Sequence, residues 1–318
     1  MATMNQHHLK FVPLQRTIGS WNLFSGALLL LLPWFGGLVL GEISDNFSQC
    51  LNFFYNETPP SGIPAAGYQP ICQRYKNQYH FASLYHRQHR APLYSAYILS
   101  PADGKRPNNT WKYEPQLAFS RASPEMKSFY GDAPVDQNVI ESQAVLEDYK
   151  NSGYTKGHLN PSMHQKTMAD REATFTLTNI VPQQAGSNSG PWSGLEREVL
   201  GKFKAYCNGS MYVITGALPY ITERWINNRV SAPEYMWSAY CCPSYSSNLP
   251  TSMKKFFPTY AAVGRNDRNS SQEIVPVNVK ARASVRGYDV RRMSLETLED
   301  ILAQRLGMPI SLFHGQCQ

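Results

Sequence analysis

The chain has 318 residues, of which 42% are hydrophobic and 17% are charged, and its formal net charge at pH 7 is +7. A chain of this length and hydrophobic content can bury one large core or two modest ones. The sequence has no internal repeat and no low-complexity tract, which excludes a repeat architecture. The basic excess is mild, so it is compatible with a polyanionic partner but does not identify one.

The first 41 residues predict a targeting segment rather than part of the fold. Trp21–Leu40 carries no charged residue and is long enough to span a membrane, but a proline and two glycines interrupt its second half. Because Gly41 offers a small residue at a cleavage position, we predict a cleaved signal peptide over residues 1–41, with an uncleaved signal anchor as the alternative. No apolar run of comparable length follows, so the mature chain is expected to be secreted or luminal, without a stable membrane span.

The cysteines and the glycosylation sequons agree with secretion. Six cysteines lie after the predicted signal peptide: Cys50, Cys72, Cys207, Cys241, Cys242 and Cys317. An even number in an oxidising compartment predicts about three disulfides, whose pairing the sequence leaves open. Zinc binding is the alternative, but no Cys-x-x-Cys pair is present. Five asparagines have the acceptor pattern and predict a glycoprotein: Asn46, Asn56, Asn108, Asn208 and Asn269.

The mature chain, residues 42–318, predicts one domain of mixed helices and strands. Residues 42–75 are expected to form an N-terminal wrap held by a disulfide. A short helix is predicted over Asn138–Asp148, where apolar residues can face one side. Alternating or β-branched and aromatic runs predict strands at Phe81–Tyr85, Leu93–Leu99, Ala173–Ile180, Met211–Thr215 (ending at Gly216), Phe256–Val263 and Glu273–Ala283.

Two further helices carry clear end signals. Pro191 suits a first helical position after Ser189 or Gly190 as the cap, and apolar residues then recur at helical spacing as far as Phe203. A second amphipathic helix is predicted over Met293–Leu306. Ser294 can cap this helix, and a glycine followed by a proline ends it.

The candidate functional residues lie in Tyr154–Arg197. This stretch contains an imidazole (His158), two amides (Asn179 and Asn188) and a carboxylate (Glu196). A neutral imidazole can take a proton from water. An amide oxygen is a hard, neutral ligand suited to Mg²⁺, and a carboxylate can hold the waters of the metal. Each residue alone also has a structural explanation, such as a helix cap or a solvated face. Together they suit one divalent metal beside a general base.

These residues also resemble a known family. Gly157-His158, Thr178–Gln183, Asn188 and Trp192-x-x-Leu195-Glu196 are similar to the DNA/RNA non-specific endonucleases, over roughly residues 70–265. The similarity is greatest to the endonuclease domain-containing 1 proteins, through Phe53-Phe54-Tyr55, Ile71–Tyr75 and Tyr94–Tyr97. The resemblance implies an α+β, ββα-metal nuclease fold: a mixed sheet with flanking helices, a disulfide-stapled surface, an N-terminal wrap and a C-terminal helical extension.

The resemblance also implies a role for each matching residue. His158 would be the general base, Asn188 would bind Mg²⁺ (or Mn²⁺), Glu196 would hold the metal through water, and Asn179 would orient His158 or the scissile phosphate. The metal would stabilise the charge that develops on the phosphate, and products would carry 5′-phosphates. DNA, RNA or both would be the substrate.

The chain departs from the family pattern just before His158. The family has Asp-Arg-Gly-His, whereas this sequence has Thr155-Lys156-Gly157-His158. Lys156 keeps a positive charge for a catalytic role but lacks the guanidinium fork, which predicts weaker phosphate contacts. Arg106, a few residues before Trp111-Lys112, and Arg197 are the other candidates for contacting phosphate.

Three function classes follow from these observations. The leading hypothesis is a secreted, Mg²⁺-dependent endonuclease that cleaves DNA or RNA with little sequence preference. The alternative is a catalytically weak or inactive glycoprotein that binds nucleic acid on a nuclease scaffold, which the replacements at positions 155 and 156 motivate. A different hydrolase or an adhesion module is the third class, but no Gly-rich phosphate loop and no Gly-x-Ser-x-Gly motif supports it. The sequence carries no signal for an oligomeric state.

Overall fold

The structure is a computed structural model that describes residues 46–63, 66–108, 110–131 and 133–317. The signal peptide predicted over residues 1–41 lies outside these ranges. In the part of the chain that is described, no helix has both the length and the apolar character needed to cross a membrane.

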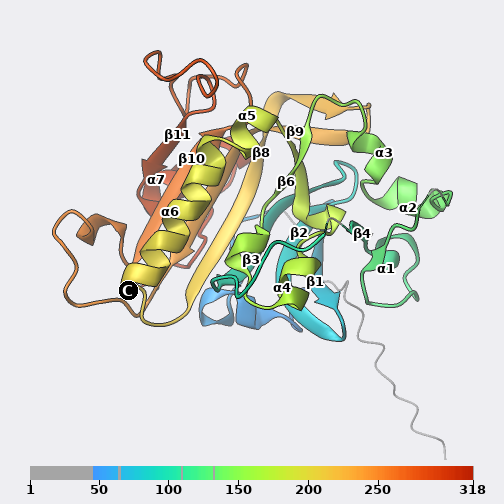
Figure 1. Ribbon diagram of the computed structural model, residues 1–318, viewed down its shortest axis with the longest axis horizontal. Helices are drawn as coiled ribbons and strands as arrows, with labels where there is room; N and C mark the ends of the chain where they lie inside the picture. Colours follow the sequence, from blue (N-terminus) through green and yellow to red (C-terminus); the bar gives the residue numbers. More distant parts are fainter. Residues whose placement is uncertain (1–45, 64–65, 109, 132, 318) are drawn as a thin grey trace, which may run out of the picture. The chain divides into compact units, whose positions relative to one another are not determined.

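A seven-stranded sheet forms the centre of the fold (Figure 1). Its order is β1-β2-β3-β8-β9-β10-β11, and every neighbouring pair is antiparallel. The α+β class is therefore confirmed, but the expected mixed sheet is antiparallel throughout. Short connections such as those between β1, β2 and β3 account for this, because only antiparallel neighbours can be joined by tight turns. The strands are β1 (Tyr68–Tyr75), β2 (Gln78–His86), β3 (Ala91–Leu99), β8 (Met211–Ile226), β9 (Val230–Cys241), β10 (Thr259–Arg265) and β11 (Val290–Met293).

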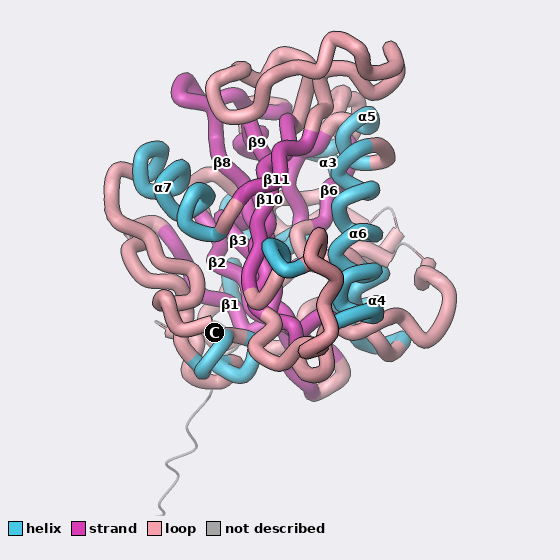
Figure 2. The backbone as a smooth tube through the Cα atoms, turned by 90° about the vertical axis from the view of Figure 1, so that its left-hand side faces the viewer, coloured by secondary structure: helices cyan, strands magenta, loops and turns pink. Residues whose placement is uncertain are grey.

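Helices cover both faces of this sheet. Figure 2 shows α7 (Leu295–Leu306) on one side of the strands and α6 (Pro191–Tyr206) on the other. The strands alternate between two hydrophobic clusters: Tyr94 and Ala96 of β3 pack in the cluster with α7, whereas Tyr97 and Leu99 pack in the cluster with α6. This alternation is the period-two burial expected of a sheet that is covered on both faces.

Short elements complete both faces: η1 (Leu51–Phe53) and η2 (Tyr55–Glu57) pack in the cluster with α7, and most of the others lie on the α6 side. The remaining strands form two small antiparallel pairs, β4 (Lys112–Tyr113) with β5 (Lys127–Ser128), and β6 (Thr155–His158) with β7 (Ile180–Gln183). The remaining α-helices are α1 (Pro115–Ala118), α2 (Gln137–Ser142), α3 (Leu146–Tyr149), α4 (Met168–Ala173) and α5 (Ala185–Asn188). The other 3-10 helices are η3 (Ser162–His164), η4 (Leu177–Asn179) and η5 (Lys254–Phe256).

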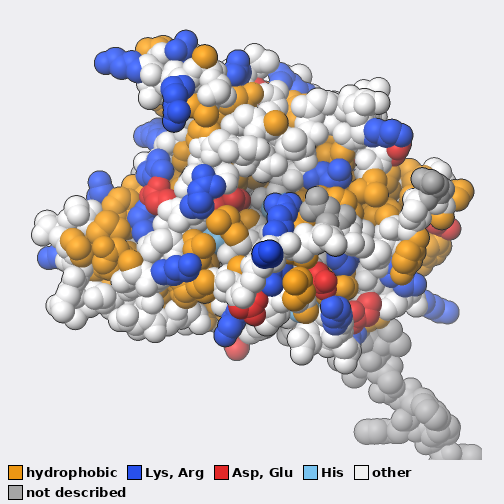
Figure 3. All heavy atoms as spheres, viewed as in Figure 1, with side chains coloured by type: hydrophobic (Ala, Val, Ile, Leu, Met, Phe, Trp, Pro, Cys, Tyr) orange, Lys and Arg blue, Asp and Glu red, His pale blue; other side chains and the backbone are white. Residues whose placement is uncertain are grey.

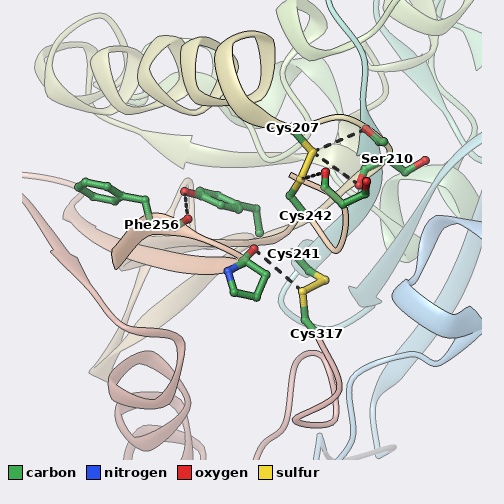
Figure 4. The surroundings of a disulfide bond; sticks show 10 residues. Cys207, Ser210, Cys241, Cys242, Phe256 and Cys317 are labelled. Carbon is green, nitrogen blue, oxygen red and sulfur yellow. Dashed lines mark hydrogen bonds between the residues drawn. A yellow bond between two sulfur atoms is a disulfide. The ribbon is translucent and has the colours of Figure 1, made fainter. Parts of the chain in front are cut away.

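Three disulfides tie the N-terminal wrap, the end of α6 and the C-terminal segment to the central sheet or to the residue that follows β9. Cys50–Cys72 holds the N-terminal wrap on β1, as the sequence predicts. Figure 4 shows the other two bridges side by side at the end of β9, where Cys241 bonds to Cys317 and Cys242 bonds to Cys207. All six cysteines are paired. The disulfide-stapled surface is therefore confirmed, and these crosslinks restrict the unfolded chain.

Both long helices match the sequence predictions closely. In α6, Pro191 is the first helical residue and Gly190 is the N-cap. In α7, the Ser294 side chain accepts a hydrogen bond from the Thr297 amide, and Gly307 ends the helix with a left-handed φ of 76°. The helix predicted over 138–148 is instead two short helices, α2 and α3.

Four predicted strands need correction. The strand predicted over Phe256–Val263 begins only at Thr259, because Phe256 ends η5. Ala173–Ile180 is no strand: it runs from the end of α4 through η4, and its residues are all buried. Its threonines are not alternating solvent-facing residues, because Thr176 and Thr178 donate hydrogen bonds to the buried Glu114 carboxylate. Glu273–Ala283 is a loop, and β11 follows it instead. The strand that begins at Met211 continues through Gly216 as far as Ile226. Gly216 has no side chain, and this leaves room for the Trp237 ring to pack against β8.

The last residue of β2, His86, is a half-buried imidazole whose protonation opposes folding. The His86 ring stacks on His89 at a centroid distance of 3.7 Å, and its Nδ1 accepts a hydrogen bond from the His89 amide at 3.1 Å. Burial, reinforced by the charge of His89, lowers the pKa of His86 from 6.5 to about 4. Protonation at Nδ1 would also break the hydrogen bond.

We expect acid to weaken this turn. Because the folded-state pKa lies below the ordinary value, the stability contribution of His86 is complete above pH 6.5 and declines as the pH falls towards 4. His86→Gln keeps a hydrogen-bond acceptor but does not titrate. The free energy of unfolding, measured by denaturant titration across this pH range, should therefore fall less steeply for His86→Gln than for the wild type. Equal slopes would contradict the assignment.

Candidate active site

His158, Asn188 and Glu196 meet at one pocket although they come from three different elements. His158 ends β6, Asn188 ends α5, and Glu196 lies in the second turn of α6. The pairing of β6 with β7, in which Thr155 faces Gln183 and His158 faces Ile180, brings the histidine beside the chain that leads into α5. The pocket has a volume of about 230 Å³, and its wall includes Arg106, His158, Arg171, Asn188, Ser193 and Glu196.

His158 is buried against aromatic rings. Its ring centroid lies 5.6 Å from that of Trp111 and 5.0 Å from that of Phe175, which it meets edge-on. Burial, together with the positive charge of Arg106, lowers the pKa of His158 to about 3. The imidazole is therefore neutral at pH 7, and its Nε2 has no hydrogen-bond partner among the described residues.

A short hydrogen-bond chain orients the Asn188 amide. Asn188 Nδ2 donates to the Thr155 hydroxyl at 2.9 Å, and that hydroxyl donates to the Gln183 carbonyl at 2.7 Å. Because the nitrogen of the amide is engaged, its oxygen remains for another partner. Gly157 makes room for this arrangement, since a side chain there would collide with that of Gln183. The threonine that replaces the family's aspartate thus holds Asn188 in place.

Glu196 is held at the pocket through its backbone. The buried His164 ring hydrogen-bonds the Glu196 carbonyl at 2.9 Å and the Tyr97 hydroxyl of β3 at 3.0 Å. This bridge ties α6 to the central sheet at the residue that faces the pocket. Burial raises the pKa of the Glu196 carboxyl to about 8, although Arg197 and Arg106 act in the opposite direction. Without a nearby cation this group is therefore largely protonated at pH 7, and a divalent cation in the pocket would favour its carboxylate form.

Asn179 lies in the core rather than on the pocket wall. Its Oδ1 accepts hydrogen bonds from the Ser95 hydroxyl (2.9 Å) and the Asn160 amide (3.0 Å), and its Nδ2 donates to the carbonyls of Asn160 and Thr174, both at 3.0 Å. The amide is fully engaged and completely buried. Contact with a phosphate would require breaking these bonds, so the geometry favours orientation of the segment after His158.

The candidate phosphate-binding residues differ in position. Arg106 lines the pocket, with its guanidinium 5.0 Å from the Phe175 ring centre. Lys156 does not line the pocket: its ammonium lies 5.4 Å from the ring centres of both Trp111 and Tyr149, and burial lowers its pKa. Arg197 is exposed beside the pocket and donates to the Ser193 hydroxyl at 2.7 Å.

Two residues of the site were missed by the sequence analysis. His164 connects Glu196 to the sheet, and the buried Arg171 on the pocket wall forms an ion pair with Asp103 at 2.5 Å. No local pattern marks either residue, because their partners are distant in the sequence.

The donor set determines what kind of metal could bind here. Within the described residues, no group of three or more His, Cys, Asp or Glu side chains is placed to hold a metal ion. The pocket instead combines one oriented amide oxygen with one carboxylate. Hard oxygen donors in small number suit Mg²⁺, which retains most of its waters. The residues therefore fit a hydrated hard cation and do not form a zinc-type cage.

The sequence matches a family model and several curated proteins. The model of the DNA/RNA non-specific endonuclease family matches residues 61–293. The endonuclease domain-containing 1 protein of Homo sapiens is 32% identical over 221 residues, which cover 68% of this chain and 43% of that protein. Its Mus musculus counterpart is 30% identical over 220 residues, with the same coverage. The mitochondrial nuclease EXOG of Homo sapiens is 38% identical over 88 residues, 26% of this chain and 23% of that protein.

The chain thus spans less than half the length of the endonuclease domain-containing 1 proteins that it matches. The family match itself covers well over half of the chain and includes every element of the pocket. The protein therefore belongs to the DNA/RNA non-specific endonuclease family.

Proposed function

We propose that this chain is a Mg²⁺-dependent endonuclease that hydrolyses the phosphodiester bonds of DNA or RNA, with Mn²⁺ as an alternative metal. The convergence of His158, Asn188 and Glu196 on one pocket carries this proposal. The three residues supply a neutral proton acceptor, a neutral oxygen ligand and a carboxylate. This is the set that one-metal hydrolysis of a phosphodiester requires.

His158 would act as the general base that takes a proton from the attacking water. Its low pKa keeps the imidazole neutral at pH 7 and therefore able to accept a proton. A negatively charged phosphate in the pocket favours the protonated ring, so substrate binding raises the basicity of His158 towards the working pH. The packing of Trp111 and Phe175 fixes the ring plane, which restricts the direction of proton transfer.

Asn188 would bind the metal through the amide oxygen that the Thr155 hydrogen bond leaves available. Glu196 would hold the water shell of the metal. The hydrogen bond from His164 to the Glu196 carbonyl keeps α6, which carries Glu196, in position. When bound, the metal would neutralise negative charge on the phosphate and lower the barrier to loss of the 3′ oxygen. Asn179 would be a positioning residue, since it fixes the backbone of Asn160 just after His158.

Arg106 and Arg197 would bind phosphate at the edges of the pocket. Contacts to phosphate carry no direct sequence information, so the enzyme would show little sequence preference. Lys156 is packed against two aromatic rings and would contribute less than the arginine of the family pattern. This packing is the observation that favours the second candidate function, a nucleic-acid-binding glycoprotein with weak catalysis.

Secretion is the second part of the proposal. Three disulfides are typical of an oxidising compartment. The five sequon asparagines, Asn46, Asn56, Asn108, Asn208 and Asn269, are all exposed, as N-glycosylation requires.

We therefore expect the full chain, expressed in cultured animal cells, to be recovered from the medium or from the lumen of the secretory pathway. Partial digestion with an endoglycosidase should lower the apparent mass of the protein in steps, with one step for each glycan. Each replacement of a sequon asparagine with glutamine should remove one of these steps. An unglycosylated protein in the cytosol would contradict secretion.

His158→Ala tests the proposed base. Loss of a general base lowers the rate by about 10²–10⁴-fold, so plasmid cleavage by the purified protein with Mg²⁺ should fall by that factor. EDTA should abolish cleavage by the wild type. His314→Ala, on the C-terminal segment away from the pocket, is the matched control and should cleave normally. Wild-type cleavage by a folded His158→Ala variant would refute the assignment, and metal-dependent cleavage by neither protein would favour the binding function.

Thr155→Val tests whether the hydroxyl orients the metal ligand. Valine keeps the shape of threonine but cannot accept from Asn188 or donate to Gln183. Loss of such a supporting hydrogen bond weakens metal binding by about 10–100-fold, so the Mg²⁺ concentration for half-maximal cleavage should rise by that factor. Thr155→Ser retains the hydroxyl and should behave as the wild type. An unchanged Mg²⁺ requirement in Thr155→Val would show that the hydrogen bond has no such role.

A further inference from the structure

Residues 277–288, here called the basic loop, lie in the connection between β10 and β11. Lys280, Arg282 and Arg286 are exposed, and the basic loop contains no acidic residue. None of the three forms an ion pair with a carboxylate in the described part of the chain. Figure 3 shows Lys and Arg side chains gathered at the upper left, where Figure 1 places this connection. Arg286 donates from Nε and Nη2 to the Ala281 carbonyl at 3.1 and 3.0 Å, which leaves its charge uncompensated and Nη1 for a ligand. The three charges are therefore available to an anionic partner.

The basic loop is held in a defined conformation although it has no regular secondary structure. The Arg282 carbonyl accepts hydrogen bonds from the amides of Val285 (3.0 Å) and Arg286 (2.9 Å), which closes one helical turn. Arg282 and Arg286 are four residues apart in this turn and thus lie on the same side. The buried Arg265 guanidinium anchors the neighbouring backbone through bonds to the carbonyls of Gly287 (2.9 Å) and Val275 (3.2 Å).

The basic loop packs directly on the segment that carries Asn188. The Tyr288 hydroxyl donates to the Gln184 side chain at 2.8 Å. The Tyr288 ring fills the space that a side chain at position 186 would occupy. The Val285 side chain lies where a Cβ at Gly190, two residues beyond Asn188, would come within van der Waals contact of it. The backbone of the basic loop is therefore held against the segment that carries the proposed metal ligand.

We propose that the basic loop binds the phosphate backbone of the nucleic acid beyond the bond that is cleaved. The inference rests on the proposed function, because it assumes that a polynucleotide lies across the pocket. The basic loop carries two guanidinium groups and one ammonium group, and no carboxylate among the described residues neutralises them. These groups can form charge-assisted hydrogen bonds to successive phosphates along a nucleic-acid strand. The basic loop would then make the enzyme favour long chains over small phosphodiesters, and it would make binding sensitive to salt.

The triple variant Lys280→Ala/Arg282→Ala/Arg286→Ala tests the basic loop. Binding of the full chain to a duplex of about 30 base pairs would be measured by fluorescence anisotropy in EDTA, over a series of salt concentrations. Each lost phosphate contact lowers the slope of log K against log salt by about 0.9, so we expect the slope to fall by about two to three. The control Lys204→Ala/Lys254→Ala/Lys255→Ala removes the same charge near the other end of α6 and should keep the wild-type slope.

A cleavage assay separates this proposal from the proposed function. With Mg²⁺ at about 0.15 M salt, the loop variant should cleave long duplex DNA roughly tenfold more slowly, which is the expected cost of lost phosphate contacts. It should hydrolyse bis(p-nitrophenyl) phosphate at the wild-type rate. Thermal denaturation would confirm that both triple variants are folded, and Arg282→Gln/Arg286→Gln provides a milder second variant.

The anisotropy measurement tests the role of the basic loop even if the wild type shows no cleavage. A lack of cleavage would overturn only the nuclease proposal. An unchanged salt slope in the loop variant, or an equal loss in the control variant, would overturn the loop proposal while leaving the nuclease proposal intact.

Discussion

The hydrogen bonds of the Asn179 amide are the constraint on which the site depends. One buried side chain accepts from Ser95 in the central sheet and from the Asn160 amide, and it donates to the carbonyls of Asn160 and Thr174. It thereby joins the sheet to the segment after His158 and to the end of α4. All donors and acceptors of the amide are used, so any replacement leaves buried polar groups unpaired, which costs about 1–3 kcal/mol for each group. The position of His158 is set by the core.

The other two functional residues are fixed in the same way, from different parts of the chain. His164 connects the Glu196 backbone to Tyr97 in the sheet, and Thr155 connects Asn188 to the end of β7. In each case the interaction engages the backbone or the far side of the functional side chain. The imidazole, the amide oxygen and the carboxylate are thus left for ligands. Such support from packed elements is what pre-organised catalytic groups require.

The sequence predicts the parts of this arrangement that depend on local patterns. The caps and the apolar spacing of α6 and α7 are local, and so are the strands around Phe81 and Tyr97. The threonines of 173–180 misled the strand prediction because their partner, Glu114, is more than sixty residues away in the chain. Family spacing indicates His158, Asn188 and Glu196. The supporting role of His164 depends on long-range contacts that no periodicity reports.

The replacement of aspartate and arginine before Gly157 has different consequences at the two positions. Thr155 accepts from Asn188 and also donates to the Gln183 carbonyl, which an ionised aspartate could not do, so the amide of the proposed metal ligand remains oriented. Lys156 lies between two aromatic rings, where its charge is a poor substitute for a guanidinium fork on phosphate. The positive charge that a polyanionic substrate needs must then come from outside the motif. In our proposal, Arg106 on the pocket wall and the arginines of the basic loop would supply it.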